Sequence, residues 1–151
     1  MKKGLFKLLG SLGYLVQYGC VVHCTFEYLG DFVLCSGPSM EPTIYSNDIL
    51  FTEHLSALTQ TIRKGDIIIA KCPTNPKQQI CKRVVALQGE KVKTGFASYE
   101  VVPIGHIWIQ GDNVSNSTDS RSYGPVPLGL VRSKAVCKVW PPSSISVLSG
   151  S

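Results

Sequence analysis

The stretches that decide the fold are DIIIAK at Asp66–Lys71, ICKRVVAL at Ile80–Leu87 and HIWIQ at His106–Gln110. Each stretch is short and rich in Ile or Val, and glycines such as Gly65 and Gly111 stand at its boundaries. Short apolar runs bounded by turn residues are typical of β-strands, whereas an amphipathic helix needs a longer run with a period near 3.6 residues. The three stretches therefore predict a mainly β domain, mostly antiparallel and barrel-like.

The chain beyond residue 35 follows the same pattern. Further short runs with strand composition occur at Asp48–Phe51, Glu90–Lys93, Tyr99–Val102 and Lys134–Trp140. The 14 glycines and nine prolines agree with a fold of many turns, and the sequence predicts no long helix in this part. We therefore assign residues 35–141 to one β-rich domain and residues 142–151, which are mainly small and polar, to a flexible tail.

Residues 1–34 differ in character and are assigned to an N-terminal membrane anchor. They begin with Lys2, Lys3 and Lys7, and from Leu12 to Phe26 the sequence LGYLVQYGCVVHCTF is apolar with few interruptions. A basic start followed by an apolar run is typical of signal anchors and organellar targeting segments. We therefore expect an N-terminal membrane-anchoring helix.

Polar residues within this anchor leave its relation to the membrane open. A bilayer span needs about 20 apolar residues, and a span over Leu12–Leu34 would include His23, Glu27 and Asp31, four residues apart on one helical face. Such a stripe fits a span that meets a partner helix, a helix on the membrane surface, or, with the cysteines beside it, a metal site. Polar groups in lipid tend to face protein or water. We favour membrane attachment and predict no metal site.

Charge and cysteine content argue against several classes of function. The net charge of +5 comes from basic residues that fall in pairs without a long run, so we predict no binding of nucleic acid. None of the six cysteines forms a CxxC pair, which argues against a zinc ribbon or a thioredoxin-like redox site. We expect small buried thiols, and the sequence leaves disulfide pairing open.

The first candidate for chemistry is Ser39, in the segment SGPSMEPT at Ser36–Thr43. Gly37, Pro38 and Pro42 favour a stiff, non-helical path that presents this serine at a fixed angle. On its own such a segment is most often an ordinary turn. Ser39 is a candidate nucleophile only in combination with a base elsewhere in the chain.

A candidate base is Lys82, within the predicted strand Ile80–Leu87. Strand alternation places this lysine on one face with Ile80 and Val84, and the opposite face is also largely apolar. Burial disfavours the charged ammonium and lowers the pKa of a lysine, as a general base requires. Arg83 cannot take this part because its guanidinium stays protonated. The alternative is an edge-strand lysine whose amine reaches solvent.

A polar run, GDNVSNSTDSR, occupies Gly111–Arg121 directly after the predicted strand HIWIQ. Asp119 and Arg121 lie two residues apart in this run and are able to pair. Loops dense in hydrogen-bonding side chains often shape active sites, and they also form plain turns.

In this order, the segments GPSMEPT, CKRVVALQGE and GDNVSNSTDSR resemble the motifs of the type I signal peptidase family, and the resemblance extends from Ser36 to Pro141. It implies a signal-peptidase-like, mostly β catalytic domain and a serine endopeptidase that removes presequences from precursor proteins. The implied site residues are Ser39 as nucleophile, Lys82 as general base, Ser117 as the hydroxyl that orients the lysine, and Asp119 with Arg121 as a supporting pair. The implied mechanism requires no metal and no cofactor.

Two features are similar to the mitochondrial members of this family. Lysine occupies the base position, where endoplasmic-reticulum members carry histidine, and the domain lacks the large insertion of many bacterial enzymes. The resemblance implies the mitochondrial inner membrane, a catalytic domain that faces the intermembrane space, and a heterodimer with a related second peptidase subunit. A compact signal peptidase of bacterial type is the alternative.

One position departs from the bacterial pattern. Some bacterial members place a serine two residues before the nucleophile, where its hydroxyl stabilises the oxyanion, and this chain has Gly37 there. We therefore expect the backbone N–H of Ser39 to be the oxyanion donor, with Ser36 as a further candidate at a different offset.

Other interpretations of these residues stay open. A Ser–His–Asp triad would need His54 or His106, neither of which lies in a recognisable motif, and a thiol protease would use Cys35 or Cys81. A self-cleaving repressor shares the Ser/Lys chemistry, but the apolar N-terminus supplies no DNA-binding domain. The rival from another class is a non-catalytic, membrane-tethered scaffold subunit of a sister peptidase, although this chain keeps both the serine and the lysine.

Overall fold

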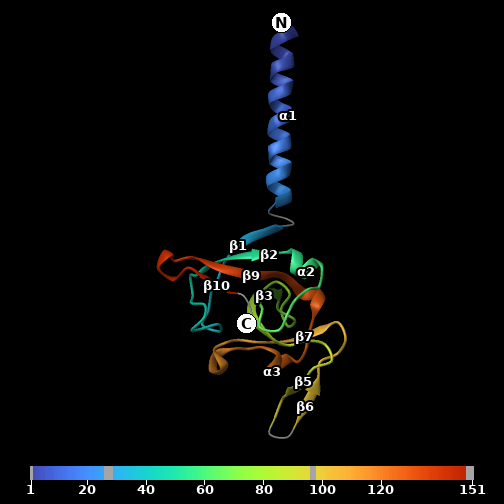
Figure 1. Ribbon diagram of the computed structural model, residues 1–151, viewed down its shortest axis with the longest axis vertical. Coiled ribbons are helices and arrows are strands. Elements are labelled where there is room, and N and C mark those ends of the chain that lie inside the picture. Colours follow the sequence, from blue (N-terminus) through green and yellow to red (C-terminus); the bar gives the residue numbers. More distant parts are fainter. Residues whose placement is uncertain (1, 26–28, 96–97, 149–151) are drawn as a thin grey trace.

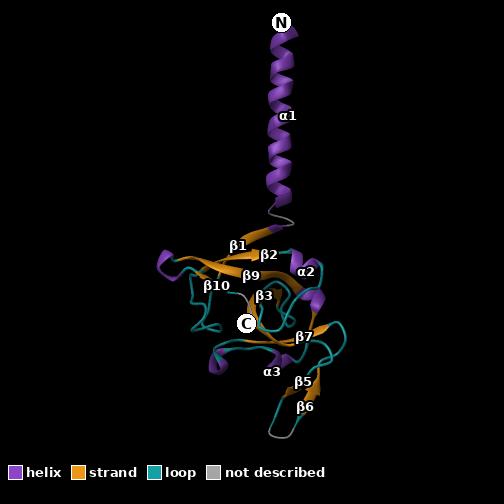
Figure 2. Cartoon of the chain, viewed as in Figure 1, coloured by secondary structure: helices purple, strands orange, loops and turns teal. Residues whose placement is uncertain are grey.

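The computed structural model describes residues 2–25, 29–95 and 98–148. A long helix, α1 (Lys2–Cys24), projects from a body in which strands predominate (Figure 1). Only short helical turns interrupt the strands of the body (Figure 2). The expected mainly β domain with an N-terminal helix is thus confirmed.

One antiparallel sheet forms most of the body. Its order is β1-β2-β9-β3-β4-β7-β8, with β10 added beside β9. The strands are β1 (Gly30–Leu34), β2 (Ile49–Glu53), β3 (Ile67–Lys71), β4 (Gln79–Ala86), β7 (His106–Gln110), β8 (Val126–Pro127), β9 (Val131–Trp140) and β10 (Ser146–Val147). Register shifts in the pairings of β9 with β2 and β3 allow the sheet to bend. Within the described residues the end strands β1 and β8 do not pair, so the expected barrel is an open sheet.

The remaining elements are small. A separate hairpin of β5 (Lys91–Lys93) and β6 (Tyr99–Val101) lies at the end of the body remote from α1 (Figure 1). The short helical segments are α2 (Leu55–Leu58), η2 (Val114–Asn116), α3 (Ser120–Tyr123), η3 (Leu128–Leu130) and η4 (Pro142–Ser144). No long helix follows residue 35 among the described residues, as expected.

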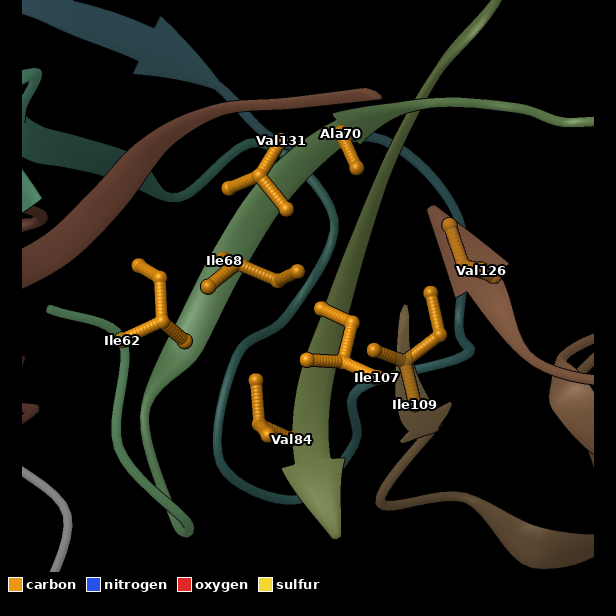
Figure 3. Close-up of a cluster of buried hydrophobic side chains, with 8 residues drawn as sticks. All are labelled: Ile62, Ile68, Ala70, Val84, Ile107, Ile109, Val126 and Val131. Carbon is orange, nitrogen blue, oxygen red and sulfur yellow. The ribbon is translucent and has the colours of Figure 1, made fainter. Parts of the chain in front are cut away.

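The core lies on both faces of β3, which explains why its sequence is almost entirely apolar. Ile68 and Ala70 contribute to one buried cluster, drawn in Figure 3, together with Val84 and Ile109. Ile67 belongs to a second cluster on the other face. A strand buried on both faces carries a continuous apolar run rather than an alternating one.

The seven predicted strands correspond to β2, β3, β4, β5, β6, β7 and β9, with small differences at their ends. The main differences lie outside them. Residues 30–34, which we assigned to the anchor, form β1, and residues 146–147 of the predicted tail form β10 on β9. Both additions are short strands whose stability comes from pairing with a long neighbour, and local sequence does not show this.

The predicted polar stripe of the N-terminal helix is wrong, because His23 lies in α1 whereas Asp31 lies in β1. The third member, Glu27, lies outside the described residues. Within the described part of the chain, no helix combines the length and apolar character required of a membrane span. All six cysteines are free thiols, of which Cys35 and Cys72 are buried as expected, while Cys20 and Cys24 are exposed.

Candidate active site

Ser39 lies half-buried in the turn between β1 and β2, and the core fixes this turn from behind. Met40 and Ile44 are almost fully buried and belong to the same apolar cluster as Ile67. Gly37 has a φ of +96°, a conformation that residues with a Cβ rarely adopt. The turn therefore has a defined path, as the Gly/Pro pattern predicts.

The segment after β7 lies directly against this turn. The backbone N–H of Asn113 donates to the carbonyl oxygen of Ser39 at 3.1 Å, and its Nδ2 donates to the carbonyl oxygen of Pro38 at 3.1 Å. A Cβ on Gly111 would collide with the carbonyl oxygen of Ser39 and with the side chain of Ser117. Glycine is therefore required at position 111 if the two segments are to meet this closely.

Lys82 is buried in β4 with only 4% of its surface exposed. It shares its face of the strand with the buried Val84, as predicted, and its Nζ donates to the hydroxyl of Ser117 at 3.0 Å. Burial lowers the pKa of Lys82, and the nearby carboxylate of Asp119 opposes this effect without reversing it. The alternative in which the amine reaches solvent does not agree with this burial.

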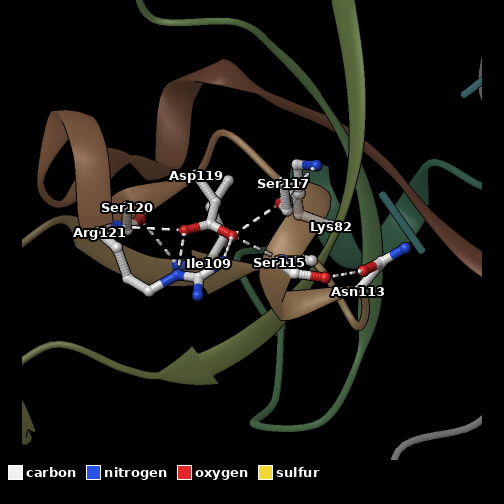
Figure 4. A network of polar contacts seen from close by, with 9 residues as sticks. Lys82, Ile109, Asn113, Ser115, Ser117, Asp119, Ser120 and Arg121 are labelled. Carbon is white, nitrogen blue, oxygen red and sulfur yellow. Dashed lines mark hydrogen bonds and ion pairs between the residues drawn. The ribbon is translucent and has the colours of Figure 1, made fainter. Parts of the chain in front are cut away.

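A chain of polar contacts extends from Lys82 to Asp119 and Arg121 (Figure 4). The hydroxyl of Ser117 donates to Asp119 Oδ2 at 2.7 Å, and Gly111 N–H donates to the same oxygen at 2.9 Å. Arg121 donates from Nε and from a terminal nitrogen to the two oxygens of Asp119, at 2.9 and 2.8 Å. Burial alone raises the pKa of Asp119, but the bonds from Arg121, Gly111 and Ser117 lower it to about 2.

A second ion pair supports the turn of Ser39, and the sequence did not predict it. Arg83 donates to both oxygens of Asp112, from Nε at 2.8 Å and from a terminal nitrogen at 2.7 Å. The hydroxyl of Thr43, in the turn, donates to Asp112 Oδ2 at 2.6 Å. Burial raises the pKa of Asp112, and the bonds from Arg83 and Thr43 lower it further than burial raises it. The signal available in the sequence was an unpaired Arg beside Lys82 and an unpaired Asp beside Gly111.

Ser39 and Lys82 line one cleft of about 640 Å³. The residues of the other proteolytic hypotheses are arranged differently around it. Cys35 and Cys81 also line this cleft, and their thiols share a hydrogen bond. His54 and His106 do not line it; His54 Nε2 lies 3.5 Å from Asp31 Oδ1, and His106 Nδ1 lies 3.0 Å from the carbonyl oxygen of Ile104. The cleft therefore offers a serine hydroxyl and a buried amine, without a histidine.

Comparison with known families agrees with these motifs. The model of the family described as signal peptidase, peptidase S26, matches residues 10–97 and 93–140. The chain belongs to this signal peptidase family. As a member it is a serine peptidase, and the hypothesis of a purely non-catalytic scaffold is not supported.

Named relatives of this peptidase are mitochondrial. It is 52% identical to the mitochondrial inner membrane protease subunit 1 of Homo sapiens over 152 residues, which cover 97% of this chain and 92% of that protein. It is 40% identical to mitochondrial inner membrane protease subunit 2 of Danio rerio over 114 residues, 71% of this chain and 62% of that protein. Among solved structures, a signal peptidase I from Enterococcus faecalis V583 matches 48% of this chain and 95% of its own, with 21% identity and a TM-score of 0.41. The relatives support the mitochondrial inner membrane as the location of the peptidase.

Proposed function

We propose that this peptidase is an endopeptidase in which Lys82 is the base for Ser39, and that it removes presequences from precursor proteins. The observation that carries the proposal is the environment of Lys82. Its amine is buried, its pKa is lowered by that burial, and it shares a cleft with a serine held in a fixed turn. An uncharged amine beside a hydroxyl is the arrangement that activates a serine without histidine.

The reaction begins when the neutral Nζ of Lys82 takes the proton of Ser39 Oγ as that oxygen attacks the scissile carbonyl. The backbone N–H of Ser39 donates to the oxyanion that forms. The ammonium of Lys82 then gives its proton to the leaving amine, and the acyl-enzyme remains. Water, deprotonated by the same lysine, attacks this ester and releases Ser39.

Ser117, Asp119 and Arg121 position the base in this scheme. The hydroxyl of Ser117 donates to Asp119, which turns its lone pairs toward the Nζ of Lys82. Arg121 holds the carboxylate of Asp119 in place from the other side. The lysine amine is thereby restrained without a direct contact to a carboxylate, which would favour its charged form.

An extended precursor segment fits the open edge of β4. Within the described residues, Gln79–Lys82 pair with β3 alone, because β7 pairs only with the part of β4 that begins at Arg83. Backbone groups along such an edge are able to pair with an added strand. We place the scissile bond near Ser39, at the end of this edge.

The proposed setting is the inner membrane, with the β body in the intermembrane space and α1 as the membrane attachment. The residues assigned to the anchor reduce in this proposal to 1–29, since β1 belongs to the sheet. Relatives named as subunit 1 and as subunit 2 both match this chain, which supports a heterodimer with a related second peptidase subunit.

The test is cleavage of labelled precursors by detergent-solubilised wild type, Ser39→Ala, Lys82→Ala and Lys82→Arg, each with and without a co-expressed second subunit. Lys64→Arg, at an exposed position, is the matched control for the arginine substitution. We expect wild type and the control to cleave and the three site variants to remain folded and inactive. Cleavage by Lys82→Arg at the wild-type rate would exclude a titrating lysine.

A further inference from the structure

A second cleft, of about 810 Å³, adjoins the cleft of Ser39 and Lys82. The two clefts share the lining residues Val33, Ile69 and Gln79. Because the same side chains form the boundary of both, the clefts make one continuous groove that leads away from the dyad.

The register of β3 and β4 shows how this groove is floored. Ile69 pairs with Cys81, and Lys71 pairs with Gln79, so these four side chains lie on one face of the sheet. The floor thus begins at Cys81, the neighbour of Lys82, and ends at Lys71 in the second cleft.

The charges of the second cleft are unbalanced. Lys71 and the exposed Arg132 line it, and neither has an ion-pair partner within the described part of the chain. The lining carboxylate, Asp31, is already engaged: it accepts from the hydroxyl of Thr52 at 2.6 Å and lies 3.5 Å from His54 Nε2. The free charge that the groove presents to a ligand is therefore positive.

We propose that this groove binds the precursor and that Lys71 and Arg132 select an acidic side chain several residues away from the bond that is cleaved. The inference rests on the proposed function, because it requires an extended substrate whose scissile bond lies at Ser39. The two cations are remote from the reacting atoms, so they stabilise substrate and transition state equally. Such uniform binding lowers KM and leaves kcat unchanged.

The test uses peptides based on a precursor that wild type cleaves. A single Asp, with Asn as its neutral match, is placed at each position on both sides of the cut. The enzymes are wild type, Lys71→Gln, Arg132→Gln, the double variant, and Lys93→Gln, an exposed lysine of the β5 hairpin outside both clefts. At one remote position we expect Asp to lower KM about two- to fivefold relative to Asn at low salt. High salt and the double variant should remove this preference, and Lys93→Gln should keep it.

Charge reversal separates recognition from loss of structure. A Lys71→Glu/Arg132→Glu enzyme should prefer Lys over Asp at the same peptide position, which a merely damaged groove would not do. Equal KM values for Asp and Asn at every position in wild type would overturn the inference alone, provided that cleavage still depends on Ser39. The same holds if the preference survives in the double variant. Cleavage that persists in Ser39→Ala would overturn the proposed function and this inference with it.

Discussion

The base and the serine turn are held by separate ion pairs, and these pairs differ in burial and in sequence separation. Asp119 and Arg121 are two residues apart, and the carboxylate of Asp119 is fully buried. Arg83 and Asp112 are 29 residues apart, and both remain partly exposed. The first pair reaches the base through one hydroxyl, and the second reaches the serine turn through another.

The comparison suggests a division of roles. The charge of Asp119 acts on the pKa of Lys82, so the first pair influences the chemistry of the base as well as its position. Asp112 is bound by Arg83 and Thr43, so the second pair fixes the path of the backbone that presents the serine. Substitutions in the two pairs should therefore have different consequences.

The largest effect is expected at Gly111, where the two networks meet. A Gly111→Ala side chain would collide with Ser117 and with the carbonyl oxygen of Ser39, and would displace both halves of the site. Displacement of reacting groups by about 1 Å costs about 100-fold in rate, and overpacking costs about 1–3 kcal/mol of stability. We expect a loss of kcat/KM of that order. Gly129→Ala, where the added methyl group has open space, should be close to wild type in both measurements.

Removal of the hydroxyl that orients the base tests the first pair. Ser117→Ala deletes the acceptor of the Lys82 amine and should lower kcat about tenfold to 100-fold with little change in KM. Ser117→Thr, which keeps a hydroxyl, should recover much of the rate. Full activity in Ser117→Ala would show that the lysine is positioned by packing alone.

Acid stability separates the two pairs by charge. The pKa of Asp119 is about 2 in the folded protein, against about 3.9 in an unfolded chain. A depressed pKa stabilises the folded state above pH 4, and this contribution is lost as the pH falls toward 2; its full size is about 2 kcal/mol. Chemical denaturation between pH 2 and pH 5 should show a weaker pH dependence in Asp119→Asn than in wild type. An unchanged slope would mean that the pair adds no acid-sensitive stability.

The smallest effect is expected at the edge of the second pair. Thr43→Val removes one hydrogen bond to Asp112 and should cost about 1 kcal/mol of stability. Activity should fall only slightly, since Arg83 still holds Asp112. Thr94→Val, whose hydroxyl contacts a carbonyl oxygen at 3.4 Å in the hairpin, is the matched control for thermal unfolding and should change neither stability nor rate.

The same contrast explains what the sequence could predict. Asp119 and Arg121 are close in the chain, and the strand around Lys82 is apolar on both faces, so their pairing and its burial followed from local pattern. The contact of Arg83 with Asp112 depends on which strands are neighbours, and alternation within one strand does not reveal that. Strand β1 was missed for a related reason, because its apolar residues continue those of the preceding segment.

The central claim is that the uncharged amine of Lys82 is the base, and the pH dependence of a single turnover tests it most directly. The acylation rate should rise with pH through a lysine pKa below its usual range, since burial outweighs the charge of Asp119. Asp119→Asn should move the midpoint to lower pH, and Asp112→Asn should leave it in place even where the rate falls. A flat profile across neutral and mildly alkaline pH, with acylation rate-limiting, would contradict the account.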